Sequence, residues 1–232
     1  MFSMLINDCM WLAFWVFYFD RFPVVKGWER QDIICLWAIL ELGYGLAYAL
    51  FGNSLNLAGM VARGELDVYL TQPKNVLLHS MVSRSMASAW GDVISGIGVF
   101  VLFGSPTPAR WLLFVTSGLL AGVFLLSFTV IAQSLVFYIG NSETLAFQMH
   151  NAMMHFSSYP TGIFEGWVRV LIFTILPAGF ISYLPIGVMR HFSWSYLASV
   201  AGVAVGFTVL AVALFNTGLR RYESGNLMTT RL

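Results

Sequence analysis

Charged side chains are scarce in this sequence of 232 residues. The 12 Lys and Arg and the 11 Asp and Glu make up 10% of the chain, against about 25% in a typical soluble domain. A soluble fold of this size needs more charge to cover the apolar surface that 58% hydrophobic residues bring. The net charge of +1 also leaves no basic patch for nucleic acid. The scarcity of charge therefore predicts an integral membrane protein without a nucleic-acid partner.

Cysteine and catalytic motifs are also scarce. Cys9 and Cys35 form no Cys-x-x-Cys pair, so they indicate neither a zinc site nor a disulfide framework. The four histidines show no metal-ligand spacing. The sequence lacks the Gly-x-x-x-x-Gly-Lys-Ser/Thr string whose backbone cradles nucleotide phosphates. We therefore expect no catalytic residue, no metal site and no cofactor bound by this chain.

Long apolar runs dominate what the sequence does contain. A spanning helix needs about 20 apolar residues, and these runs are apolar all round, which favours helices in lipid. We expect about six such helices, at residues 1–19, 33–51, 86–103, 111–139, 163–184 and 194–218. The sequence thus predicts an all-α integral membrane protein in which 1–232 is a single transmembrane domain.

The positions of the basic residues suggest an orientation. By the positive-inside rule, the long 52–84 segment and the Arg220-Arg221 tail favour the cytoplasm for both termini. The loops 20–31 and 104–110 then face outward.

Two pairs of glycines at four-residue spacing predict close helix contacts. These are Gly118 with Gly122 and Gly202 with Gly206. Such pairs let helix backbones approach closely. They indicate either packing within the chain or contact between two copies.

The most informative polar stretch is 62–73, Ala-Arg-Gly-Glu-Leu-Asp-Val-Tyr-Leu-Thr-Gln-Pro. On a helix, Leu66 and Leu70 share one face, and Glu65 and Asp67 lie on the opposite side. The proline at its end stops the helix. This short amphipathic helix either lies on the inner membrane surface or docks a cytoplasmic partner.

Three acidic residues, Asp8, Glu41 and Asp92, lie inside expected spans. A charge at bilayer depth costs about 3 kcal/mol on insertion scales, so such residues suggest a function. They either line a polar path for a cationic substrate, or they are neutral or paired inside the bundle. Glu41 is the best candidate, because the other two are close enough to span ends to reach water. The possible pairing groups are Tyr44, Ser88, Ser95 and Arg84.

Two prolines, Pro177 and Pro185, interrupt the fifth apolar run. A helix that loses backbone hydrogen bonds at membrane depth must bury the break in protein or line a cavity. The prolines therefore indicate either a kink or a broken span. Tryptophans at the ends of the apolar runs favour an interfacial belt, with an aromatic wall for a flat cation as the alternative.

Four pieces of the sequence resemble a type-2 ABC exporter permease family, the viologen-exporter-like permeases. The first is Arg63-Gly-Glu-Leu-Asp67 with the following Leu70 and Pro73. The others are Phe22–Trp28; Tyr159-Pro160 with Ile163, Phe164, Arg169, Pro177, Tyr183 and Pro185; and Arg221–Ser224. The resemblance extends from about residue 5 to residue 225.

The resemblance implies a permease subunit of an exporter in the bacterial cytoplasmic membrane. It implies that 57–84 contains a cytoplasmic coupling helix, seated in a groove of a separate ABC ATPase that is present in two copies and binds ATP and Mg. It also implies a broken fifth span with a short re-entrant segment on the outer face. The residues implied in coupling are Arg63, Gly64, Glu65, Leu66, Asp67, Leu70 and Pro73. The residues assigned to the translocation path are Glu41, Asp92, Arg169, Pro177, Tyr183 and Pro185.

Two other classes of function stay open on the residues alone. One is an ATPase-independent secondary transporter or channel, and the other is a non-transporting membrane scaffold. Secondary carriers often show inverted repeats, and the first and last three expected spans show no convincing repeat. Because a chain of 232 residues is too short to build two related halves around a path, we expect a second permease, the same or a related chain, within the lipid membrane.

Overall fold

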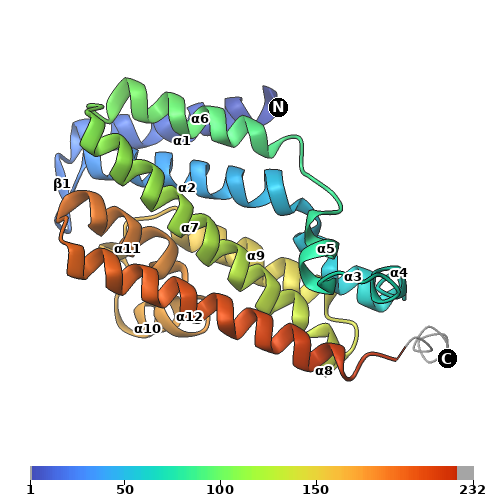
Figure 1. Cartoon of the computed structure of the whole chain (residues 1–232). Coiled ribbons are helices and arrows are strands. Elements are labelled where there is room, and N and C mark those ends of the chain that lie inside the picture. The colour runs from blue at the N-terminus through green and yellow to red at the C-terminus, as the bar shows by residue number, and fades with distance from the viewer. Residues whose placement is uncertain (1, 224–232) are drawn as a thin grey trace.

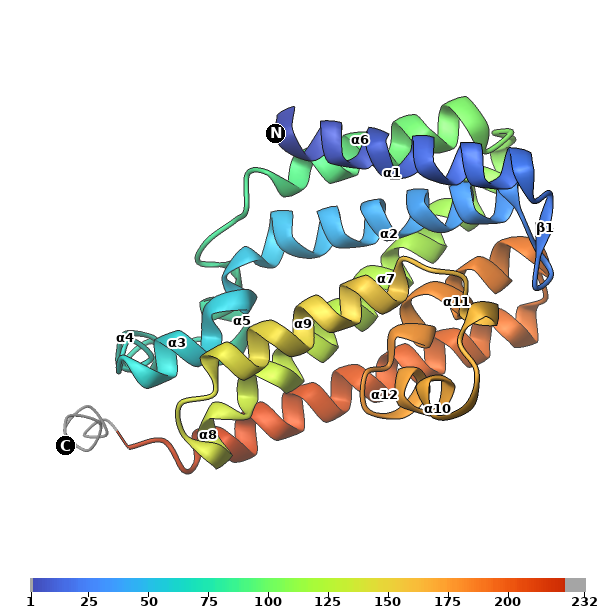
Figure 2. The same ribbon diagram turned by 180° about the vertical axis from the view of Figure 1, so that it is seen from behind.

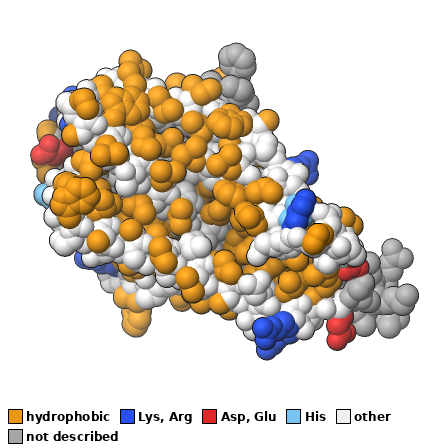
Figure 3. Space-filling model, viewed as in Figure 1, with side chains coloured by type: hydrophobic (Ala, Val, Ile, Leu, Met, Phe, Trp, Pro, Cys, Tyr) orange, Lys and Arg blue, Asp and Glu red, His pale blue; other side chains and the backbone are white. Residues whose placement is uncertain are grey.

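The structure is a computed structural model that describes residues 2–223, and it is 79% helical. Its long helices form an elongated bundle (Figures 1 and 2). They are α1 (Phe2–Arg21), α2 (Arg30–Phe51), α6 (Ala89–Phe103), α7 (Pro108–Ser134) and α12 (Trp194–Leu219). Figure 3 shows apolar side chains across the visible face, with charged side chains towards the two ends.

Shorter elements connect these helices. A two-stranded hairpin of β1 (Val24–Val25) and β2 (Trp28–Glu29) links α1 to α2. The remaining elements are η1 (Gly52–Asn56), α3 (Leu57–Ala62), α4 (Asp67–Leu70), α5 (Val76–Val82), α8 (Val136–Ile139), α9 (Glu143–Ser157), η2 (Thr161–Ile163), α10 (Gly166–Thr174) and α11 (Ala178–Arg190).

Local sequence sets the starts of the long helices. Thr107 caps α7 by accepting a hydrogen bond from the Arg110 backbone N–H, and Pro108 follows at the first helical position. Ser193 caps α12 in the same way. These caps satisfy backbone donors that a helix start leaves unpaired.

The helix α2 forms the centre of the bundle and packs against both α6 and α7. A side chain at Gly43 would meet the Gly118 carbonyl oxygen and the Gly122 amide nitrogen at 2.9 Å each. The expected close packing at Gly118 and Gly122 is therefore intramolecular. Gly202 and Gly206 on α12 differ, because nothing lies within 4 Å of the position a side chain would take there.

The connections gather at two opposite ends of the bundle (Figure 1). At one end, the Gln31 amide donates to the Ser105 hydroxyl at 3.4 Å, and the Arg190 guanidinium donates to the Gly27 carbonyl at 2.8 Å. We call this the hairpin end. At the other end lie α3, α4 and α5, which belong to the 52–84 segment. The expected loops 20–31 and 104–110 thus share one end, opposite 52–84; the tail beyond residue 223 lies outside the described residues.

The fifth apolar run, expected at 163–184 as a kinked or broken span, is interrupted in the structure. The structure divides this region into α10 and α11, which are bent by 84° relative to each other. Pro177 lies at the break, whereas Pro185 lies within α11 and does not end a helix. The apolar run predicted helix content correctly, but the break at Pro177 changes its direction.

Two ion pairs show how the chain passes along the bundle in this region. Glu143 lies 3.9 Å from Arg63 in the 52–84 segment, and Glu165 pairs with Lys26 of the hairpin end at 2.7 Å. The segment 143–165 therefore runs from one end to the other (Figure 2). The α10–α11 pair starts beside Lys26 and returns to the hairpin end, where Arg190 contacts Asp32 at 3.1 Å.

By length and composition, three helical segments within residues 2–223 are able to cross a membrane. These are Arg30–Ala62, Pro108–Ile139 and Trp194–Leu219, and the bent α10–α11 pair makes a fourth if it is counted as one span. The α6 helix is apolar but shorter. The chain is thus an all-α, membrane-embedded protein.

Candidate functional sites

The sequence pattern predicts one amphipathic helix across 62–73. The structure does not contain it. Gly64 adopts a φ of 73°, a left-handed conformation that turns the chain between α3 and α4. Leu66 is fully buried, whereas Leu70 is 43% exposed. The Leu70 N–H donates to the Leu66 carbonyl at 3.1 Å, so the two leucines keep helical spacing although only Leu66 is buried. The turn at Gly64 shortens the expected helix, because it separates the end of α3 from α4.

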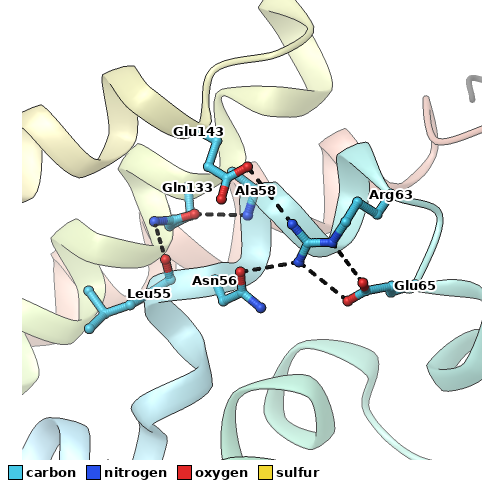
Figure 4. A network of polar contacts seen from close by, with 7 residues as sticks. All are labelled: Leu55, Asn56, Ala58, Arg63, Glu65, Gln133 and Glu143. Atoms are coloured by element: carbon cyan, nitrogen blue, oxygen red, sulfur yellow. Dashed lines mark hydrogen bonds and ion pairs between the residues drawn. The ribbon is translucent and has the colours of Figure 1, made fainter. Parts of the chain in front are cut away.

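A polar network holds the turn in place (Figure 4). The Arg63 Nε donates to Glu65 Oε1 at 2.7 Å, and its other nitrogens face Asn56 Oδ1 at 3.3 Å and Glu143 Oε2 at 3.9 Å. The hydrogen bond from Arg63 to Glu65 raises the pKa of the Arg63 guanidinium, and the nearby carboxylates add to this. We call this set, with Gln133, the Arg63 network.

Gln133 anchors the same region from α7. Its Oε1 accepts a hydrogen bond from the Ala58 backbone N–H at 2.8 Å, and its Nε2 donates to the Leu55 carbonyl at 2.8 Å. The Ala58 N–H is one of the donors that the start of α3 leaves unpaired. Glu143 and Gln133 were not among the predicted site residues, because they lie far from Arg63 in the sequence.

Asp67 contacts Tyr222, in the segment that follows α12 (Trp194–Leu219). The Tyr222 hydroxyl donates to Asp67 Oδ1 at 2.9 Å. Burial of the Tyr222 phenol and its bond to Asp67 raise the pKa of Tyr222 to about 12. The structure therefore brings Arg63, Glu65 and Asp67 together in one segment, each with contacts inside the chain.

The side chains that this segment presents outward are partly apolar. Val68 is 62% exposed, and Leu70 and Pro73 are also exposed. An open groove of about 460 Å³ lies beside them, lined by Asn53, Asn56, Met60, Glu65, Val68, Tyr69, Ser83 and Arg84. This end of the bundle thus offers an exposed surface built on fixed backbone.

A second candidate site lies within the bundle. A cleft of about 240 Å³ is lined by residues of α1, α2, α6 and α9. Asp8, Glu41 and Asp92 all line it, and each is at most 7% exposed. Neither carboxylate oxygen of Glu41 has a hydrogen-bond partner of good geometry, although Ser95, one of the suggested pairing groups, lies close enough to interact with it. We call this the acidic cleft.

Aromatic rings form part of the wall of the acidic cleft. Trp11 and Trp37 stack with ring centroids 5.6 Å apart, and Tyr159 meets Trp11 edge-on at 6.1 Å. Trp37 is buried and Trp11 is partly buried. This arrangement offers negative charge and aromatic faces in one small space.

The other residues assigned to a path lie apart from this cleft. Arg169 and Tyr183 are exposed on α10 and α11. Pro177 precedes α11, and Pro185 lies inside it, where its carbonyl accepts a hydrogen bond from Ser117 at 3.0 Å. The structure thus brings Glu41 and Asp92 together with Asp8, but not with these four residues.

Comparison with known proteins gives one match. The family model described as "ABC-2 family transporter protein" matches residues 5–225, which is nearly the whole chain. No curated protein and no solved structure matches the chain.

Proposed function

The chain belongs to the ABC-2 transporter family, and we propose that it is the membrane-spanning permease subunit of an ATP-binding-cassette exporter. Family membership and the long apolar helices support a permease subunit embedded in a membrane. A separate cytoplasmic ATPase, in two copies with ATP and Mg, drives transport outward across the bacterial cytoplasmic membrane. A second permease, the same or a related chain, completes the path.

We assign six crossings to the permease. They are α1, α2, α6, α7 with α8, the 143–165 segment, and α12. The ion pairs of Glu143 with Arg63 and of Glu165 with Lys26 support the fifth crossing, since they lie at opposite ends of the bundle. The α10–α11 pair then forms a re-entrant element on the outer side, and the 52–84 segment faces the cytoplasm.

The observation that supports coupling is the fixed position of the 52–84 segment. The Arg63 network ties it to α7 and α9, and Tyr222 ties it to the chain that follows α12. A displacement of this segment would therefore be transmitted by direct contacts to α7, to α9 and to the chain that follows α12. Val68 and Leu70 project from it, so we place the contact with the ATPase at these two apolar side chains, with the half-exposed Glu65 beside them.

The test compares two double variants, each co-expressed with the proposed ATPase subunit. Val68→Glu with Leu70→Glu places charge in the proposed contact. We expect at least about a tenfold loss of ATPase recovered with the permease, because two apolar contacts are lost and two charges are desolvated.

The matched control is Phe22→Glu with Val24→Glu, which changes two exposed apolar residues at the hairpin end. It should leave ATPase recovery unchanged. Equal recovery in both variants would show that Val68 and Leu70 do not contact the ATPase. ATP hydrolysis by the purified permease alone would contradict the exporter-permease assignment itself, because the sequence has no phosphate-binding loop.

A further inference from the structure

Four carboxylate oxygens of the acidic cleft lack a hydrogen-bond partner of good geometry in the described part of the protein. Both oxygens of Glu41, and Oδ2 of Asp8 and of Asp92, are buried without one. Glu41 also lies within electrostatic range of the other two. A buried charge without a partner costs several kcal/mol, as a rough magnitude. The cleft therefore has a strong unmet preference for a positively charged group.

Protonation of the three acids would remove their charge but would leave these oxygens short of hydrogen bonds, because a neutral carboxylic acid still has a hydroxyl to donate and a carbonyl to accept. Ser95, a polar neighbour of Glu41 and Asp8, forms no bond of good geometry with the four oxygens named above. No lysine or arginine lines the cleft in the described part of the chain, and its basic lining residue, His155, is exposed. An ammonium group that entered the cleft would favour the ionised carboxylates and would supply the N–H donors that their oxygens lack.

The aromatic wall narrows the chemistry of such a donor. Trp11 and Trp37 stack on each other and both line the cleft, and aromatic rings attract cations and pack against flat apolar groups. A quaternary ammonium would satisfy the rings but has no N–H for the carboxylates. A protonated primary or secondary amine satisfies both. The volume of about 240 Å³ suits a small ligand.

We propose that the acidic cleft binds a small arylalkyl amine, with the ammonium N–H groups bonded to Glu41 and its neighbouring aspartates and the ring against Trp11 and Trp37. The ligand class is then the transported substrate class of this permease. That last step depends on the proposed function, whereas the binding itself does not.

The first test measures binding by calorimetry to the full purified chain in detergent, with no ATPase present. Phenethylamine is the probe, and its N,N,N-trimethyl derivative and phenethyl alcohol are the comparison ligands. We expect the amine to bind and the trimethyl derivative to bind at least about tenfold more weakly, since about 1.4 kcal/mol of hydrogen bonding is lost. The alcohol, which lacks the charge, should bind more weakly still.

Equal binding of the amine and its trimethyl derivative would overturn the proposal, because the carboxylates would then not form hydrogen bonds with the ligand. Equal binding of the alcohol would overturn it as well, by showing simple apolar partition. These comparisons use the unaltered chain, so they hold even if cleft variants fold poorly.

The second test alters the cleft. Glu41→Gln and Asp92→Asn should each weaken phenethylamine binding by about tenfold or more, whereas Glu165→Gln, on the exposed Glu165 of the hairpin end, should not. Unchanged binding in both cleft variants would place the ligand elsewhere. Because no ATPase takes part, a negative result would count against the cleft and leave the permease assignment standing.

Discussion

At Arg63, one guanidinium contacts Glu65, Glu143 and Asn56, whereas at Glu41 neither carboxylate oxygen has a hydrogen-bond partner. The first group is about half exposed, and the second is buried. Solvent therefore screens the charge of Arg63 but contacts little of Glu41. The side chain with several partners is the one that solvent could also stabilise, whereas the side chain without them is buried, where desolvation costs most free energy.

This difference separates two uses of charge. The Arg63 network fixes a surface segment relative to α7 and α9, which suits an element that transmits force. The acidic cleft leaves buried carboxyl oxygens without hydrogen-bond partners of good geometry, which costs stability and suits an element that binds a ligand. Substitutions that break the Arg63 network should therefore lower the free energy of unfolding, whereas substitutions that remove a carboxylate from the acidic cleft should raise it.

The largest loss of stability should come from the buried part of the Arg63 network. Gln133→Leu leaves the Ala58 N–H and the Leu55 carbonyl without partners. Each unpaired buried group costs about 1–3 kcal/mol, so we expect the free energy of unfolding to fall by roughly 2–5 kcal/mol. The midpoint of thermal unfolding in detergent measures this.

Gln148→Leu is the matched control, because Gln148 is exposed on α9. It should change the unfolding midpoint little. If the two variants unfold at the same temperature, Gln133 does not stabilise the start of α3, and the 52–84 segment must be held by other contacts.

An intermediate effect of opposite sign should come from the acidic cleft. Glu41→Met replaces an unpartnered buried carboxylate with an apolar side chain of similar volume, so we expect unfolding to require about 1–3 kcal/mol more. Arg63→Met, which breaks a half-exposed ion pair, should lower the same free energy by about 1 kcal/mol or less. If both substitutions destabilise the protein, Glu41 must have hydrogen-bond partners in the folded state. The proposed difference between the acidic cleft and the Arg63 network would then be wrong.

The apolar runs predicted most of the helices well. The run 33–51 corresponds to α2 (Arg30–Phe51), and the run 194–218 corresponds to α12 (Trp194–Leu219). Hydropathy works here because these helices present apolar side chains to lipid or to one another. The count of six crossings stays a prediction.

The 143–165 segment escaped this reasoning because it carries polar side chains on both its exposed and its buried faces. His150 Nδ1 lies 3.2 Å from the Tyr48 hydroxyl and 3.4 Å from the Thr129 hydroxyl, all buried. Such a buried network lowers the hydropathy of α9 without exposing it to water. A scale that counts residues one at a time cannot distinguish this from a surface helix.

The candidate sites were predictable in part. The cost of charge at bilayer depth identified Asp8, Glu41 and Asp92 from the sequence, and the structure places them in one cleft. That they meet depends on how α1, α2 and α6 pack, which the sequence pattern does not reveal. The same holds for Glu143 and Gln133, whose contacts with the 52–84 segment depend on the packing of α7 and α9.

The smallest predicted effect concerns the link between Asp67 and Tyr222. Below pH 10 the Tyr222 phenol is neutral in both the folded and the unfolded chain, so its bond to Asp67 contributes fully. Between the ordinary tyrosine pKa of 10 and the folded pKa of about 12, the unfolded chain loses this proton first. Stability must therefore fall as the pH rises through this range.

Tyr222→Phe should remove that part of the pH dependence and lower the free energy of unfolding at pH 8 by less than about 1 kcal/mol, because the phenol is partly exposed. Lys26, whose pKa is raised by its hydrogen bond to Glu165, also titrates at high pH, but it is present in both proteins and cancels in the difference. The measurement is the unfolding midpoint of each protein from pH 8 to 12. Parallel curves would mean that Asp67 does not hold Tyr222 in solution, and the 52–84 segment would then be tied to α7 and α9 but not, through this bond, to the chain that follows α12.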